Sequence, residues 1–286
     1  MLRLMRDRTR QAAAILIAVA AVTAGCGGDG EEPVILATTT STQDSGLLDV
    51  LIPAFEAESG REVKTIAVGS GEAIELGARG EADVVLAHSP AAEEELMAGG
   101  KGASRRTVMH NDFVLVGPSD DPAGVRDDEP ADALAAIADA EATFISRGDE
   151  SGTHTFELGL WEDAAVEPAG DWYQESGQGM GATLQIANDK DAYTVTDRGT
   201  YLATDAAKDL EIVVEGGADL LNVYHVIAVA DDAGERVNAE GATALANFLV
   251  APEAQEMIGG FGMEEFGEPL FVPDAGKTDD EIRAGA

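Results

Sequence analysis

The residues best suited to bind a ligand lie in the stretch 142–155, which reads ATFISRGDESGTHT. Its first five residues form a short apolar run, which predicts a buried strand. Arg147 follows this run, and Ser151, Gly152 and Thr153 then begin a predicted helix that reaches Trp161. The first backbone N–H groups of a helix have no partner within the helix, and a guanidinium adds charged donors beside them. The predicted chemistry is the binding of an oxyanion.

Two other predicted strands end in similar residues. Thr38, Thr39, Thr40 and Ser41 follow a strand at 34–37, and Gly69-Ser70-Gly71 follows a strand at 62–68. Ligands of open α/β sheets bind beyond the carboxyl ends of the strands, where backbone N–H groups and hydroxyls can donate hydrogen bonds. One such loop means little, because serine and threonine begin many helices. Three of them, together with an arginine, favour a tetrahedral oxyanion.

The residues alone leave the identity of this anion open. A site made of N–H and O–H donors suits an ion without a proton of its own, such as sulfate, molybdate or tungstate. Phosphate usually carries a proton and needs an acceptor, which Asp149 or Asp197 could supply. Sulfate, molybdate, tungstate and phosphate therefore all remain candidates.

Other chemistries have weaker support. Ser151 and His154 could form a nucleophile–base pair of a hydrolase, but the nucleophile elbow G-x-S-x-G is absent from the sequence. The four histidines do not have metal-ligand spacing: His88, His110, His154 and His225. We therefore predict a binding protein without a cofactor or metal, and not an enzyme.

Two motifs in the second half of the chain fit structural roles better than catalytic ones. Gly177–Gly181 resembles a phosphate cradle, but it lacks the lysine of a P-loop, so a tight loop at a cleft or hinge is the preferred interpretation. Arg198 is predicted to form a salt bridge that braces the second domain. A role as a second anion ligand is the alternative for Arg198.

The predicted strands and helices alternate along the chain, which indicates βαβ units and a mostly parallel sheet. The polar tail after Pro273 is expected to be mobile, and residues 220–230 form an apolar run that could cross between domains. Further strands are predicted at 83–87, 112–116, 192–196 and 212–215, and further helices at 46–59, 71–77, 90–97, 131–140, 182–188 and 242–258.

Length and charge limit the function. A chain of 286 residues is long enough for two α/β domains. Its formal net charge of −36 argues against nucleic acid and anionic membrane surfaces as partners. This charge suits a very soluble exported protein or one adapted to high salt.

Residues 1–26 are predicted to be a lipoprotein signal peptide. Four arginines precede an apolar run at 12–24 that is too short to span a bilayer comfortably, and small residues at 23–25 precede Cys26. The position of Cys26 resembles a bacterial lipobox, in which the cysteine is lipidated. An ordinary signal peptide with an incidental cysteine is the alternative. Residues 27–33 are predicted to be a flexible tether.

Taken together, the chain resembles the Tup-type family of substrate-binding lipoproteins of tungstate ABC transporters, over residues 34–271. The motifs that carry the resemblance are TTTS (38–41), VGSG (68–71), ADVVL (82–86), NDFVLVGP (111–118), SRGD (146–149), SGTH (151–154), GQGMG (177–181) and YTVTDRGTY (193–201).

The resemblance implies a type II periplasmic-binding-protein fold, in which two α/β lobes are joined by two crossover segments with a ligand cleft between them. Residues 34–113 and 222–286 would form the first lobe, and residues 114–221 the second. Thr38–Ser41 and Ser70 would line the cleft from the first lobe. Arg147, Ser151, Gly152 and Thr153 would line it from the second, with Arg147 in contact with the anion.

The resemblance also implies how the protein works. It would be a monomer, held at the outer face of the cell membrane by a lipid on Cys26, that captures tungstate and delivers it to a permease driven by an ATPase. Binding of molybdate, sulfate or phosphate by the same fold is the alternative.

Overall fold

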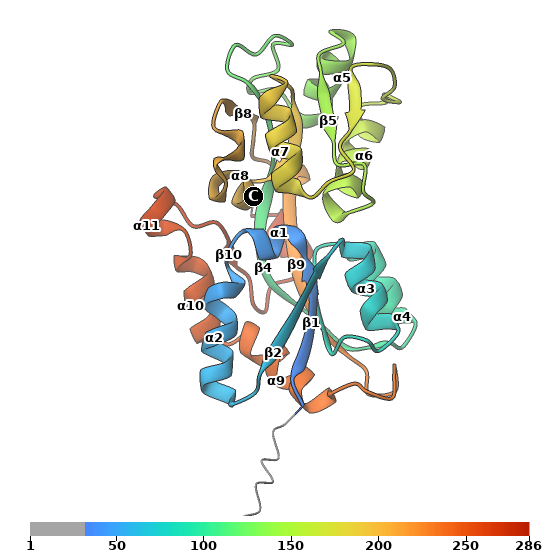
Figure 1. Cartoon of the computed structure of the whole chain (residues 1–286), viewed down its shortest axis with the longest axis vertical. Helices are drawn as coiled ribbons and strands as arrows, with labels where there is room; N and C mark the ends of the chain where they lie inside the picture. The colour runs from blue at the N-terminus through green and yellow to red at the C-terminus, as the bar shows by residue number, and fades with distance from the viewer. Residues whose placement is uncertain (1–31, 286) are drawn as a thin grey trace, which may run out of the picture. The chain divides into compact units, whose positions relative to one another are not determined.

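The structure, a computed structural model, describes residues 32–285 (Figure 1). The predicted signal peptide, Cys26 and most of the predicted tether lie outside these residues. Within residues 32–285, no helix is both long and apolar enough to cross a membrane.

Strands and helices alternate along most of the described chain. The strands are β1 (Val34–Thr39), β2 (Val63–Val68), β3 (Val84–Ala87), β4 (Gly102–Pro118), β5 (Phe144–Ser146), β6 (Tyr173–Glu175), β7 (Thr194–Asp197), β8 (Leu210–Val214), β9 (Leu221–Val229) and β10 (Val272–Pro273). The helices are α1 (Thr40–Asp44), α2 (Leu48–Ser59), α3 (Ser70–Ala78), α4 (Pro90–Ala98), α5 (Pro130–Asp139), α6 (Gly152–Asp163), α7 (Met180–Asp189), α8 (Arg198–Ala203), α9 (Ala239–Leu249), α10 (Pro252–Gly260), α11 (Met263–Phe266) and α12 (Asp279–Arg283).

The main sheet is mixed, so the prediction of a mostly parallel sheet was wrong. Its strand order is β10-β4-β9-β3-β1-β2, and β7 and β8 also pair with β4. Only β1–β2 and β1–β3 are parallel in this sheet, whereas β4 and β9 pair antiparallel with their neighbours. The prediction failed because β4 is far longer than the apolar run at 112–116. Its first half carries the polar residues Arg105, Arg106 and His110, which hide the strand pattern.

The long strand β4 serves two lobes. Residues Gly102–Asp112 pair with β9, and residues Phe113–Pro118 pair with β7 and β8. Buried apolar side chains form separate clusters next to the two parts of β4. Clusters next to the first part surround β1, β3, β9, α2 and α9, and clusters next to the second part surround β7, β8, α5 and α6. Two α/β lobes therefore share β4. Lobe boundaries at 113/114 and 221/222 remain a prediction.

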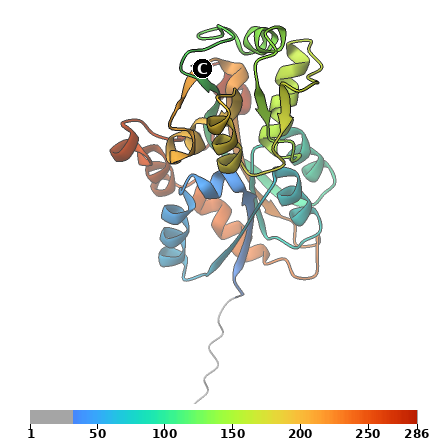
Figure 2. The ribbon, with the colours of Figure 1, turned by 45° about the horizontal axis from the view of Figure 1, so that its top comes forward.

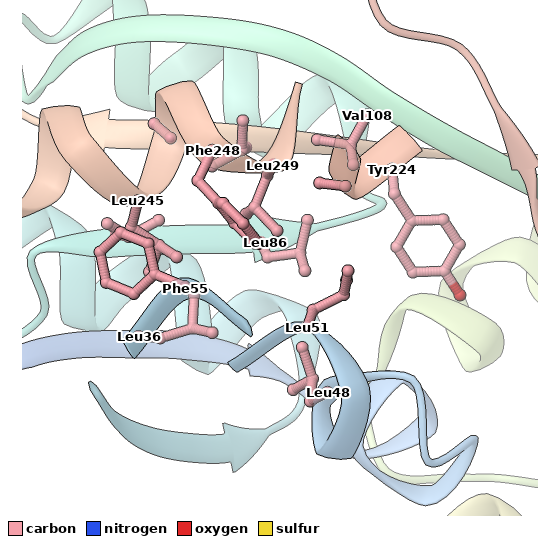
Figure 3. Packing of buried hydrophobic residues seen from close by; sticks show 14 of the residues in the cluster. Leu36, Leu48, Leu51, Phe55, Leu86, Val108, Tyr224, Leu245, Phe248 and Leu249 are labelled. Carbon is pink, nitrogen blue, oxygen red and sulfur yellow. The ribbon is translucent and has the colours of Figure 1, made fainter. Parts of the chain in front are cut away.

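The largest cluster of the first lobe packs α2 and α9 against the sheet. Phe55 and Phe248 meet edge to face with ring centroids 5.5 Å apart, and Leu36, Leu51 and Leu245 are fully buried beside them. Figure 3 shows Tyr224 at the edge of this cluster, with its hydroxyl directed away from the leucines. The cluster therefore joins α2 and α9 to the sheet that carries β1, β3 and β9.

Two predicted segments differ in the structure. The single helix predicted at 242–258 is two helices, because Pro252 has no N–H group to continue α9 and instead begins α10. The tail after Pro273 is not the mobile segment predicted. Thr278 caps α12 in a capping box with Glu281, and Ile282 is buried.

Candidate functional site

The N-termini of α3 and α6 meet between the two lobes. Both views place α3, in teal, beside α6, in yellow-green (Figures 1 and 2). A Cβ atom added to Gly69 would lie 3.9 Å from the Cα atom of Ser151, and one added to Gly152 would lie 2.6 Å from Ser70 Oγ. Because the first N–H groups of each helix have no partner within the helix, their donors and positive dipole ends converge here.

Two buried polar atoms at this meeting point have no hydrogen-bond partner among residues 32–285. They are Ser70 Oγ and His88 Nδ1, in side chains that are 1% and 8% exposed. A Cβ atom on Gly152 would lie 3.2 Å from His88 Nδ1, so both atoms face the first residue of α6. Buried polar atoms are almost always paired, and two unpaired ones in one place indicate a ligand site.

Hydroxyl groups at the end of β1 form a compact network around the start of α1. Thr39 Oγ1 caps the helix by accepting a hydrogen bond from the N–H of Thr42, at 3.2 Å. The same oxygen lies 2.7 Å from Thr42 Oγ1 and 3.1 Å from Ser41 Oγ. Thr40, the first residue of α1, is half-buried. The structure therefore brings Thr39, Thr40 and Ser41 together at the carboxyl end of β1.

Thr38 has a different role from the other residues predicted for this loop. Its Oγ1 donates a hydrogen bond to the backbone carbonyl of Leu86, at 2.9 Å, where β1 pairs with β3. Its hydroxyl is therefore engaged within the sheet.

Arg147, directly after β5, is only 3% exposed. Its Nε donates to Asp149 Oδ2 at 3.1 Å, and its Nη2 donates to the same oxygen. Burial alone would raise the pKa of Asp149, but hydrogen bonds from Arg147 and Ser151 outweigh burial and lower the pKa. The charge of Arg147 also reaches the first lobe, where it partly offsets the rise that burial causes in the pKa of Asp44. Asp149 thus holds the buried guanidinium of Arg147 in place by accepting its hydrogen bonds.

The two carboxylates that could accept a proton from phosphate are already engaged. Asp149 accepts hydrogen bonds on both oxygens, from Arg147 and from the N–H of Ser151. Asp197 accepts from the N–H and the Oγ1 of Thr200, at 2.9 and 2.7 Å, and from Asn111. A proton on phosphate would have to compete with these donors.

Ser151 and His154 are arranged as a helix cap. Ser151 Oγ accepts a hydrogen bond from the N–H of His154, at 3.3 Å, and His154 Nδ1 accepts one from the N–H of Glu150, at 3.0 Å. The imidazole thus binds the backbone and not the serine hydroxyl. This geometry does not support a nucleophile–base pair.

Arg198 forms the predicted salt bridge. Its Nε and Nη2 donate to the two oxygens of Asp112, at 2.8 and 2.7 Å, and Nη2 also donates to Glu215 at 2.6 Å. The hydrogen bonds that Arg198 donates to Asp112, and then the one that it donates to Glu215, raise the pKa of Arg198. Because two carboxylates already engage its guanidinium, the structure favours a salt bridge over anion binding. The bridge joins the two lobes and does not brace the second alone, because Asp112 lies in the part of β4 that pairs with β9.

One residue of the site escaped the sequence prediction. His88 directly follows β3, and its position at a strand end was the available signal. The Gly177–Gly181 loop, predicted to be a tight loop at a cleft or hinge, leads into α7, with Gly179 as the N-cap, and α7 contacts α1. Among residues 32–285, no group of three or more histidine, cysteine or acidic residues is arranged to hold a metal ion.

Glu157 fixes α6 to the strands behind it. This buried carboxylate accepts hydrogen bonds from Ser146 Oγ at 2.8 Å, Trp161 Nε1 at 3.0 Å and Tyr173 OH at 2.9 Å. Burial raises its pKa although these hydrogen bonds act in the opposite direction. The folded protein therefore binds this proton more tightly than the unfolded chain does, so the contribution of Glu157 to stability falls as the pH rises through the raised pKa.

Replacing Glu157 with alanine should lower the free energy of unfolding by about 2 kcal/mol, because three buried donors lose their acceptor. Urea denaturation followed by circular dichroism measures this change. Glu162→Ala is the matched control, since Glu162 lies exposed on the same helix and its loss should change stability by less than about 0.5 kcal/mol. Equal effects of the two substitutions would contradict the anchoring role.

The chain is similar to known substrate-binding proteins over most of its length. A family model of the PBP superfamily domain matches residues 20–253. The tungstate-binding protein TupA of Peptoclostridium acidaminophilum is 50% identical over 247 residues, which cover 85% of this chain and 86% of that protein. This chain belongs to the Tup-type family of substrate-binding proteins. It is also 52% identical over 255 residues to a putative ABC transporter anion-binding protein of Haloferax volcanii, with 87% and 74% coverage.

This Tup-type chain has the same fold as a protein whose structure has been solved. The tungstate ABC transporter protein of Geobacter sulfurreducens is 47% identical, with a TM-score of 0.75 and coverage of 82% of this chain and all of that one. The fold is therefore that of a periplasmic binding protein, with two α/β lobes and a cleft between them, as predicted. These relatives are transport proteins and not enzymes.

Proposed function

We propose that the protein captures tungstate, as the WO₄²⁻ oxyanion, in the cleft between its lobes and delivers it to the permease of an ABC importer. The observation that carries this proposal is the meeting of the α3 and α6 N-termini around the unpaired Ser70 Oγ. Helix N-termini and hydroxyls supply hydrogen-bond donors but no carboxylate to accept a proton from the ligand. Such a site suits a fully deprotonated oxyanion. The tungstate-binding relatives, about half identical to this chain, support tungstate among such ions.

In this proposal, both lobes contribute ligands. Thr39, Thr40, Ser41 and Ser70 contact the anion from the first lobe, and Arg147, Ser151, Gly152 and Thr153 from the second. Thr38 supports this loop from within the sheet, because its hydroxyl donates to the backbone carbonyl of Leu86 and its strand is paired on both sides. The anion replaces the water between the lobes and stabilises their closed arrangement.

The location of the protein is part of the proposal. A lipid on Cys26 would anchor it as a monomer at the outer face of the membrane, where the permease and its ATPase receive the anion. The charge of −36 keeps such a protein soluble outside the cell.

Calorimetric titration of the chain without residues 1–26 tests the proposed ligand. Tungstate should bind with one site and with a higher affinity than molybdate, sulfate or phosphate. If one of the other three anions binds more tightly than tungstate, that anion is the ligand and the assignment of tungstate is wrong. Absence of heat with all four would overturn the proposal. Phosphate is the least favoured alternative because Asp149 and Asp197 already accept hydrogen bonds on both oxygens.

A further inference from the structure

His88 occupies an unusual place at the edge of the proposed site. It follows β3, and its ring lies 4.8 Å from the ring of Tyr224 and 6.2 Å from that of Phe113, measured between centroids. Its Cε1 and Nδ1 atoms would lie 2.8 and 3.2 Å from a Cβ atom on Gly152. An imidazole of the first lobe thus contacts the first residue of the helix that the second lobe presents to the anion.

The packing around His88 gives the ring carbons apolar contacts, but it gives Nδ1 no hydrogen-bond partner among residues 32–285. Burial and aromatic contacts explain an apolar side chain at this place, whereas Nδ1 is buried and has no partner among residues 32–285. Leaving such an atom unpaired costs about 1–3 kcal/mol. A partner that arrives with the ligand would remove this cost, and Ser70 Oγ faces the same point with the same deficit.

We propose that His88 is a further ligand of the oxyanion, and that its ring takes up one proton from solvent as the anion enters. The neutral imidazole becomes an imidazolium, and its Nδ1–H donates a charged hydrogen bond to an anion oxygen. This inference rests on the proposed function, because it requires an oxyanion in the cleft.

The charged groups around His88 explain why the proton arrives with the anion. The pKa of His88 is lowered to about 4, first by burial and also by the charge of Arg147, although Glu93 and hydrogen bonds with Asn222 and with the backbone of His88 act in the opposite direction. Glu93 already accepts a hydrogen bond from Arg105 at 2.9 Å, and burial raises the pKa of Tyr224, which keeps its phenol neutral. A dianion would compensate Arg147 and attract the imidazolium.

The sign of the pH effect follows from this change. Anion binding raises the pKa of His88, so the complex holds more protons than the free protein at every pH between the two pKa values. Tungstate affinity should therefore rise as the pH falls toward the free value of about 4. Within this window, one proton per anion corresponds to a change in Kd of roughly tenfold per pH unit.

Titration of the unaltered protein with tungstate, in buffers of different ionisation enthalpy, measures this proton uptake directly. If the ligand raises the pKa of His88 into the range between about pH 6.5 and 8, uptake should approach one proton per anion at the acid end of this range and should fall toward zero at its alkaline end. Nitrogen-15 NMR should show the ring nitrogens of one buried histidine changing from neutral to protonated when tungstate is added.

His88→Asn identifies the group that takes up the proton, because asparagine places a polar nitrogen near the position of Nδ1 but does not titrate. We expect this variant to bind tungstate roughly tenfold more weakly at the acid end of the range, with almost no proton uptake and a pH-independent Kd. His154→Asn is the matched control and should retain the uptake, since the ring of His154 binds the backbone of Glu150.

The possible outcomes separate this inference from the proposed function. Tungstate binding without proton uptake in the unaltered protein would overturn the role of His88 and leave the proposed function intact. Undiminished uptake in the His88→Asn variant would place the proton on another group and would also overturn it. Absence of binding with all four oxyanions would overturn both proposals. If the variant does not fold, the buffer series and the NMR measurement on the unaltered protein still decide.

Discussion

Replacing Gly152 with alanine should weaken tungstate binding roughly hundredfold, because the added methyl group prevents the lobes from meeting. The new Cβ atom would lie 2.6 Å from Ser70 Oγ and 2.8 Å from His88 Cε1, closer than such atoms pack. Overpacking of this kind costs up to about 3 kcal/mol, which is roughly a hundredfold change in Kd. Calorimetric titration with tungstate measures the loss.

Gly159→Ala is the control for this experiment, since Gly159 lies on the same helix and a Cβ atom there would have nothing within 4 Å. It should leave the affinity unchanged and can add up to about 1 kcal/mol of stability, because alanine favours helix. Alanine also suits the helical backbone at Gly152, so both variants should fold. Equal affinities of the two variants would show that the lobes do not close on Gly152.

Replacing Arg147 with alanine should weaken tungstate binding by about 1.5–3 kcal/mol, which is roughly ten- to hundredfold in Kd. The variant loses a buried cation between the lobes, and it also leaves Asp149 without the partner that now neutralises it. A carboxylate beside the cleft would then repel the anion. Titration with tungstate measures the effect, and an unchanged affinity would reassign Arg147 to a purely structural role.

Three further variants separate the contributions to this effect. Arg126→Ala removes one positive charge from an exposed position of the second lobe and should leave Kd within about twofold, because exposed charges are screened by salt. Arg147→Lys keeps the charge but loses the planar fork, so it should retain part of the affinity and discriminate less between tungstate and molybdate. Adding Asp149→Asn to Arg147→Ala should recover part of the loss if repulsion by Asp149 contributes.

Local patterns were sufficient to predict those parts of the fold whose signal is local. Local patterns predicted the strands β1, β2 and β3 and their alternation with helices. The same approach failed where the signal depends on distant partners. β4 extends to Gly102 through polar residues because pairing with β9 satisfies its backbone, and α12 is ordered because Thr278 caps it and Ile282 is buried.

The site residues divide in the same way. Serine, threonine and glycine at strand ends, together with Arg147, were recognisable as donors because their chemistry does not depend on their neighbours. His88 was dismissed as one of four scattered histidines. Only its burial, its unpaired Nδ1 and its approach to Gly152 distinguish it, and none of these properties can be read from the order of residues.

The sequence by itself therefore determined the chemical character of this protein: an acidic chain with a predicted export signal, whose strand ends carry hydrogen-bond donors and an arginine suited to an oxyanion. The tertiary structure alone decided which donors face one another. Antiparallel pairing of β4 with β9, β7 and β8 unites the lobes, and it sets Ser70 and His88 against Gly152. Helix N-termini bind an anion tightly only when several point at the same place, and that convergence is a property of the folded chain.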